Sequence, residues 1–232
     1  MIQNAEFLDG ALNVMREGFY PDESACTALG LPQHPEAISE LEELTIRTSR
    51  DGVSVIAIES ATQKVVGAAF NKLQVKNNSE DGSYFENYAK SCKYSSSRGL
   101  VKFMIDADAA CDMFEYCHVD CLLEIMFLGT LPEFRKSGIG KKLCEVSTEI
   151  ARSLLRGDNI KQPMNGKELP LEPVPKIVSA LFTSPTSQRI GRSLGWEIVA
   201  RISYEKFFHE GKTFASILGK DIPDTTLEFK RL

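Results

Sequence analysis

The order of hydrophobic patterns along the 232 residues predicts an α+β domain. Residues 122–128 are mostly apolar, with β-branched and aromatic side chains, and this composition is typical of a buried strand. Residues 140–155 then repeat apolar side chains along one helical face. We expect a helix, a helix, a hairpin and a helix before this pair, and a strand, a helix and a hairpin after it.

The N-terminal half begins with Leu8, Leu12 and Met15 at helical spacing, and Asp51-Gly52 is a turn signal. The elements expected there are a helix over 5–18, a helix over 35–50, a hairpin of strands 53–58 and 65–75, a polar loop over 77–97 and a helix over 100–116. After the central pair we expect a strand over 177–182, a helix over 187–194, and a closing hairpin of strands 198–208 and 213–217.

Length and composition favour one domain over residues 1–232, because a chain that is 43% hydrophobic can bury a sizeable core. The net charge is −5 and no basic tract occurs, which argues against nucleic acid as a partner. Neither a signal peptide nor an apolar run of membrane-spanning length is present. The six cysteines form no Cys-x-x-Cys pair, so we expect free thiols in a reducing compartment and no metal site. We also expect a cytoplasmic protein that is a monomer.

A glycine-containing turn, Arg135-Lys136-Ser137-Gly138-Ile139-Gly140, separates the central strand from the following helix. Free N–H groups and the positive dipole end at a helix start favour a phosphate, and glycine lets a ligand approach the main chain. The lysines that follow, Lys141 among them, add positive charge. The alternative is an ordinary strand-turn-helix connection with solvated lysines.

This turn resembles the pattern Gln/Arg-x-x-Gly-x-Gly/Ala, which binds the pyrophosphate of coenzyme A in GNAT-superfamily acetyltransferases. The resemblance implies a mixed central sheet flanked by helices, acetyl-CoA as co-substrate and no metal. It also implies that the backbone N–H of Leu128 stabilises an oxyanion and that the end of the strand pairs with the pantetheine arm. The implied coenzyme-binding residues are Phe127, Leu128, Gly129, Arg135, Lys136, Ser137, Gly138, Ile139, Gly140 and Lys141.

Two further segments resemble the insect arylalkylamine N-acetyltransferases. The first, FYPDE, is similar to their Phe-Phe-x-Asp-Glu-Pro segment, which implies that Glu23 is the general base. The second, TSPTSQR, is similar to their Ser-Ser-x-x-Ser-x-Arg segment, which places catalytic hydroxyls on Thr183 and Ser187. The implied reaction is direct attack of a small primary amine, such as dopamine, serotonin, octopamine or tyramine, on acetyl-CoA in a ternary complex.

The chain departs from this pattern in several places. Ser24 replaces the proline after the Glu, and Thr183 replaces the first serine. Gly191 occupies the position where many superfamily members carry a tyrosine that acts as the general acid. The strand that usually precedes the first helix is short or absent. Asp22 competes with Glu23 as the base, and Ser187 could be a helix N-cap. The alternative function is an acyl-CoA-binding protein that acts on another amine or a longer acyl donor, or that regulates without catalysis.

Overall fold

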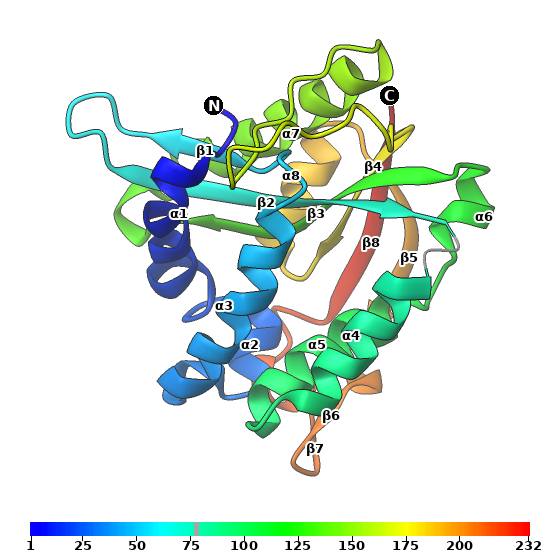
Figure 1. Cartoon of the computed structure of the whole chain (residues 1–232). Helices are drawn as coiled ribbons and strands as arrows, with labels where there is room; N and C mark the ends of the chain where they lie inside the picture. Colours follow the sequence, from blue (N-terminus) through cyan, green and yellow to red (C-terminus); the bar gives the residue numbers. More distant parts are fainter. Residues whose placement is uncertain (77–78) are drawn as a thin grey trace.

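In the computed structural model, the chain folds around a mixed sheet with the strand order β1-β2-β3-β4-β8-β5 (Figure 1). The structure describes residues 1–76 and 79–232, and only the backbone of residues 79–84. Strands β3 and β4 are parallel, and the other neighbours are antiparallel. The predicted α+β class with a mixed sheet is therefore confirmed. The six strands are β1 (Val55–Ile58), β2 (Val65–Val75), β3 (Cys121–Thr130), β4 (Ile177–Phe182), β8 (Asp224–Arg231) and β5 (Glu197–Ser203).

Helices cover both faces of the sheet, and each face has its own hydrophobic core (Figure 1). One core lies under α1 (Leu8–Val14), α2 (Ser24–Ala28), α3 (Pro35–Ser49), α4 (Ser79–Ser91) and α5 (Ser95–Asp108). The other lies under α7 (Ile139–Leu155) and α8 (Pro185–Ser193). A smaller cluster contains α6 (Met113–Cys117), and α9 (Phe214–Leu218) follows a short β6–β7 pair, Phe208–His209 with Lys212–Thr213. No described helix has both the length and the apolar character needed to span a bilayer.

The N-terminal segment forms an isolated bridge at the place of the first strand that the sequence analysis expected to be short or absent. Ile2 forms an isolated bridge with Val55, and Gln3 donates its backbone N–H to the Ser54 carbonyl at 2.8 Å. The first helical region continues from α1 through a π-helical turn, Met15–Phe19, which delivers the chain to the predicted FYPDE segment.

Two predictions between β2 and β3 are wrong. The loop expected over 77–97 is largely helical, as α4 and the start of α5, although residues 77–78 lie outside the described part of the chain. The helix expected over 100–116 is broken after Asp108, because Asp112 caps a new helix by accepting the N–H groups of Phe114 (2.9 Å) and Glu115 (3.1 Å). The apolar side chains of both pieces still face the protein interior, so the hydrophobic period concealed the break.

The predicted closing hairpin is also wrong. Strand β5 pairs with β8, which the sequence analysis missed, and residues 214–218 form α9. Phe207 and Phe214 pack with Phe103 in an aromatic cluster instead of alternating along two strands. Strand β8 was missed because it buries polar side chains, Thr226 and Glu228 among them, where a buried strand is expected to be apolar.

Candidate active site

Strands β3 and β4 part at the centre of the sheet. Their parallel pairing runs only from Leu123↔Val178 to Ile125↔Ala180, whereas β3 continues to Thr130. Met126 is an extra residue in the ladder with β2, since Ile125 and Phe127 pair with consecutive residues of β2. Such a bulge bends a strand and increases its twist. Beyond Ile125, the edge of β3 that faces β4 has no strand partner within the described chain.

The backbone at this open edge can be oriented from the ladder with β2. Leu131 donates its N–H to the Val66 carbonyl at 2.9 Å, and the register is continuous back to Phe127. Hydrogen-bonded and non-hydrogen-bonded pairs alternate in an antiparallel ladder, so the N–H groups of Leu128 and Thr130 point away from β2. The Thr130 carbonyl agrees with this, since it accepts from Arg135 Nε at 3.4 Å.

The predicted phosphate turn ends at the start of α7. Lys136 (φ 61°) and Gly138 (φ 85°) take left-handed conformations, and Gly138 is the N-cap residue. No side chain caps this helix, and the first N–H bonded back to the turn is that of Lys142, which donates to the Gly138 carbonyl at 3.0 Å. The preceding N–H groups of the first turn are thus left for a ligand or water. A Cβ on Gly138 would meet no atom within 4 Å, so the space above the turn is open.

One cavity of about 790 Å³ joins the open edge, the turn and the loop after α1. Apolar side chains from α5 and β3 form much of its wall. Ser137 is the one predicted site residue that does not line it; its Oγ donates to the Phe134 carbonyl instead. The other predicted site residues all line the cavity: Glu23, Phe127, Leu128, Gly129, Arg135, Lys136, Gly138, Ile139, Gly140, Lys141, Thr183 and Ser187.

The two adjacent carboxylates Asp22 and Glu23 have different surroundings. Glu23 is the N-cap of α2, with Oε2 accepting the Cys26 N–H at 2.8 Å. Its other oxygen, Oε1, is buried and has no hydrogen-bond partner in the described chain. Asp22 Oδ2 is instead paired with Arg135 Nη1 at 2.6 Å. Of these two carboxylates, only Glu23 has a buried oxygen without a hydrogen-bond partner in the described chain.

Arg135 is held at the base of the phosphate turn. Besides the ion pair with Asp22, it donates Nη2 to the Gly18 carbonyl at 2.9 Å and Nε to Thr130. Its guanidinium thus ties the loop after α1 to the turn, and its charge is already partly balanced. Lys136 and Lys141 line the cavity and have no ion pair among the described residues, so they supply the positive charge left for a phosphate.

The serines at the start of α8 form a reciprocal cap. Ser184, not Ser187, is the N-cap: it accepts the Ser187 N–H at 3.2 Å, while Ser187 Oγ accepts the Ser184 N–H at 3.1 Å. The two hydroxyls lie 3.1 Å apart. Ser187 is therefore not the N-cap of α8, because it occupies the third helical position. Ser184 was not singled out from the sequence, although the Ser-x-x-Ser spacing is that of a capping box.

Tyr204 is hydrogen-bonded to the backbone of Thr183 at the cavity wall. Its hydroxyl donates to the Thr183 carbonyl at 2.7 Å, and the ring is fully buried. Burial, with the Glu23 carboxylate nearby, raises the pKa of Tyr204, so the phenol stays neutral. Nothing in the sequence marked this residue, because the position looked like an ordinary strand residue.

Two further carboxylates line the cavity and were not predicted. Glu124 lies in β3 and Asp108 at the end of α5. Burial raises the pKa of both, and the Glu124 charge adds to the rise for Asp108. A signal for Glu124 existed in the sequence, since it is a charged residue within an otherwise apolar strand. Among the described residues, no group of three or more His, Cys, Asp or Glu side chains could hold a metal ion.

The glycine at position 191 has a packing reason. A Cβ there would lie 2.1 Å from Glu228 Oε2 and 2.7 Å from Phe182. A tyrosine at this position would have to displace the Glu228 side chain and the Phe182 ring, so the packing here favours glycine.

No protein-family model matches this chain, and no curated protein matches it in sequence. Arylalkylamine N-acetyltransferase 2 from Aedes aegypti is similar in structure, with a TM-score of 0.78 and 22% identity, over 100% of this chain and 97% of that one. This chain has the GNAT acetyltransferase fold.

Other solved structures with this fold also match nearly the whole of this chain. The Drosophila melanogaster polyamine N-acetyltransferase, which forms N-acetylagmatine, has a TM-score of 0.73 and 15% identity over 100% of this chain and 98% of its own. A putative arylalkylamine N-acetyltransferase 7 from the yellow fever mosquito has a TM-score of 0.77 and 16% identity, over 99% of this chain and 85% of its own. The similarity to GNAT acetyltransferases expected from the turn and the FYPDE segment is confirmed at the level of fold.

Proposed function

We propose that the protein transfers the acetyl group of acetyl-CoA to a small primary amine. One observation carries this proposal: a single cavity connects an uncapped helix start, an unpaired strand edge and the buried, unpaired Oε1 of Glu23. The helix start suits the pyrophosphate and the strand edge suits the pantetheine amides. The carboxylate suits a cationic amine. The similar solved structures act on arylalkylamines or polyamines, which supports an amine acceptor.

The proposed reaction begins with the amine bound as ammonium, because a primary amine has a pKa of about 10. Glu23 Oε1 binds the cation and takes one proton, directly or through a water molecule. The neutral nitrogen then attacks the thioester carbonyl carbon, and a new N–C bond forms. The N–H of Leu128 stabilises the oxyanion, because it points away from β2 toward the opening.

Collapse of the intermediate breaks the C–S bond and releases the coenzyme A thiolate. The nitrogen loses its second proton, which the sulfur can take up, since a thiol has a pKa of about 8.5. We assign Ser187, within the Thr183–Ser187 segment at the cavity wall, to assist this departure. No step requires Ser137 or the carboxylate of Asp22.

The preferred acceptor is an arylalkylamine such as dopamine, serotonin, octopamine or tyramine. The aromatic and thioether side chains along the cavity suit a flat apolar ring; they are Phe19, Phe103, Met104, Met126 and Phe127. We place this enzyme in the reducing cytoplasm, because its six cysteines form no disulfide. We also propose that it acts as a monomer.

Thiol release tests the proposed activity. Purified protein with acetyl-CoA should release free thiol only when a primary amine is added, and mass spectrometry should find the N-acetyl product. Rates of thiol release with a panel of aromatic monoamines and aliphatic amines identify which class of amine is the acceptor. Coenzyme A binding without product for any amine would support the non-catalytic alternative.

Ser187→Ala should lower turnover more than it lowers the melting temperature. The capping bond from the backbone N–H at position 187 to Ser184 Oγ survives this change, although the helix loses the three contacts of Ser187 Oγ with the Ser184 N–H, hydroxyl and carbonyl. Thr213→Ala is the matched control, because it removes the N-cap of α9 outside the cavity at a cost of about 1 kcal/mol. If Ser187→Ala behaves like Thr213→Ala, losing stability and no turnover, the hydroxyl has only a structural role.

A further inference from the structure

Asp108 and Glu124 line the cavity, yet the proposed acetyl transfer uses neither. Glu124 faces Ser179 in the last stretch of parallel pairing, one residue before the point where β3 and β4 part. Asp108 is the last residue of α5. They reach the cavity from different elements than Glu23, which comes from the loop before α2.

Glu124 is a buried carboxylate with unused acceptor capacity. Its residue is only 8% exposed, and Oε2 accepts a hydrogen bond from Gln74 Nε2. Its other oxygen, Oε1, has no hydrogen bond in the described chain, and the residue lines the cavity. Lys72 lies near enough for its charge to oppose the rise in the Glu124 pKa, but it donates to Asp51 at 3.0 Å.

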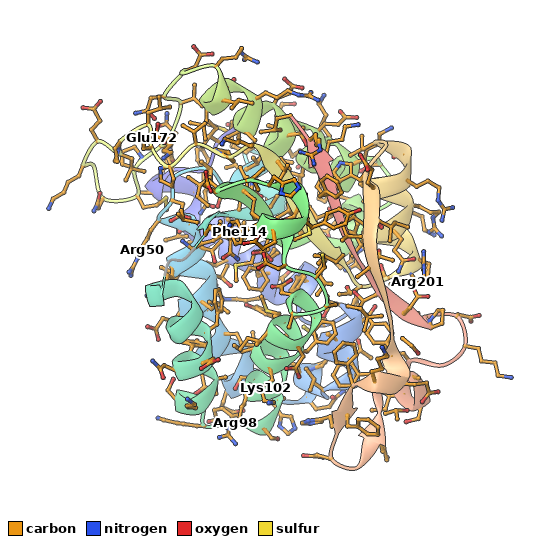
Figure 2. The ribbon with its side chains drawn as sticks, turned by 90° about the vertical axis from the view of Figure 1, so that its right-hand side faces the viewer. Arg50, Arg98, Lys102, Phe114, Glu172 and Arg201 are labelled. Carbon is orange, nitrogen blue, oxygen red and sulfur yellow. The ribbon has the colours of Figure 1, made fainter. Side chains whose placement is uncertain are left out.

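Asp108 has no hydrogen-bond donor and no ion pair among the described residues; its one charged neighbour is the like-charged Glu124. Two carboxylates without a cation between them disfavour each other's ionisation. Figure 2 labels Arg98 and Lys102 on α5, and neither lines the cavity, so this helix brings no cation to Asp108. The native fold thus retains two carboxylates that cost stability and that form no ion pair within the described chain, with Gln74 as the one hydrogen-bond donor to them.

We infer that Asp108 and Glu124 form a subsite for a second cationic group, an ammonium or guanidinium, so that the cavity accepts amines with such a group at their far end in addition to singly charged arylalkylamines. The inference rests on the proposed function for the first amine at Glu23. Between the two acidic ends, apolar side chains such as Phe103 and Met104 line the cavity and suit a methylene chain. A cation between Asp108 and Glu124 would satisfy both carboxylates and remove their mutual repulsion.

Binding of matched amines to the protein loaded with coenzyme A tests this subsite by calorimetry. A series of α,ω-diamines of increasing length is compared with amino alcohols of the same lengths, which keep the first ammonium and replace the second by a neutral hydroxyl. At the best length, the diamine should bind at least about tenfold more tightly, because a hydrogen bond to a charged group contributes about 1.5–3 kcal/mol. Equal affinities at every length would overturn the inference.

Asp108→Asn should abolish the preference for diamines and leave the affinity for amino alcohols unchanged. It should fold, since it removes one of two repelling buried charges, and Glu124→Gln is a second variant for the same test. Asp106→Asn is the matched control, because Asp106 is exposed on the same helix and does not line the cavity. A preference that survives in both Asp108→Asn and Glu124→Gln would also overturn the inference.

Thiol release by the same variants separates the two proposals. If diamines bind preferentially and no amine yields product, the proposed function fails while the subsite stands. If amines are acetylated and diamines have no advantage in affinity, the subsite fails while the proposed function stands.

Discussion

Glu23→Gln should lower turnover at saturating acetyl-CoA by about 10²–10⁴-fold, which is the usual contribution of a general base. Glutamine keeps the shape of the side chain but can neither attract the ammonium by charge nor accept its proton. It can still accept the Cys26 N–H, so the cap of α2 should persist and the melting temperature should change little. Coenzyme A affinity, measured by calorimetry, should stay intact.

The pH dependence of this variant is diagnostic. Its deficit should shrink as the pH rises toward the pKa of the amine, about 10, because more substrate then arrives neutral. A deficit that is the same at every pH would point to a role in binding or folding rather than in proton transfer.

Asp22→Asn is the control for Glu23→Gln, one residue away. Asp22 is exposed and paired with Arg135, so its loss should affect turnover much less. If Asp22→Asn is the inactive protein and Glu23→Gln keeps full turnover, the base is assigned one residue too late. If neither variant is impaired, the base lies elsewhere in the cavity.

Gly138→Val should weaken coenzyme A binding by at least about tenfold while the protein remains folded. The side chain would occupy the open space above the turn, where we place the pyrophosphate, and would block charge-assisted hydrogen bonds worth about 1.5–3 kcal/mol each. Because φ is 85° at this position, a β-branched residue also strains the backbone, at a cost of about 1–3 kcal/mol. Calorimetry with coenzyme A and thermal melting measure the two effects separately.

Gly157→Val controls for this strain. Gly157 follows the opposite end of α7, has φ 93°, and a Cβ there would also meet no atom within 4 Å. It should therefore lose similar stability and keep full coenzyme A affinity. Unchanged affinity in a folded Gly138→Val protein would mean that the pyrophosphate binds elsewhere.

The elements around the central strand could be predicted because local sequence determines them. The apolar run of β3 and the amphipathic period of α7 are properties of contiguous residues, and glycine at position 138 is required by its left-handed backbone. Glu23 was singled out by the resemblance of the FYPDE segment, and neither α2 nor the N-cap role of Glu23 at its start was predicted. Nearly all the residues that the resemblance singled out line one cavity.

The errors lie where long-range contacts override local patterns. Strand β8 is inserted between β4 and β5 with Thr225, Thr226 and Glu228 buried, so its polarity concealed a central strand. Phe214 lies in a segment that the sequence pattern predicted to be a strand. Its side chain instead packs in an aromatic cluster with Phe103, which is distant in sequence. Burial of this kind depends on partners that no local window contains.

The sequence by itself determined the strand-turn-helix unit, the glycines at the helix start and the carboxylate after the first helix, because backbone conformation and helix capping depend on adjacent residues. Only the tertiary structure decided which carboxylate is available. Asp22 is paired with Arg135, 113 positions away, while Glu23 keeps one buried oxygen unpaired. It also brought Asp108 and Glu124 to the same cavity, since a helix end and a strand become neighbours only when the sheet and its covering helices have packed.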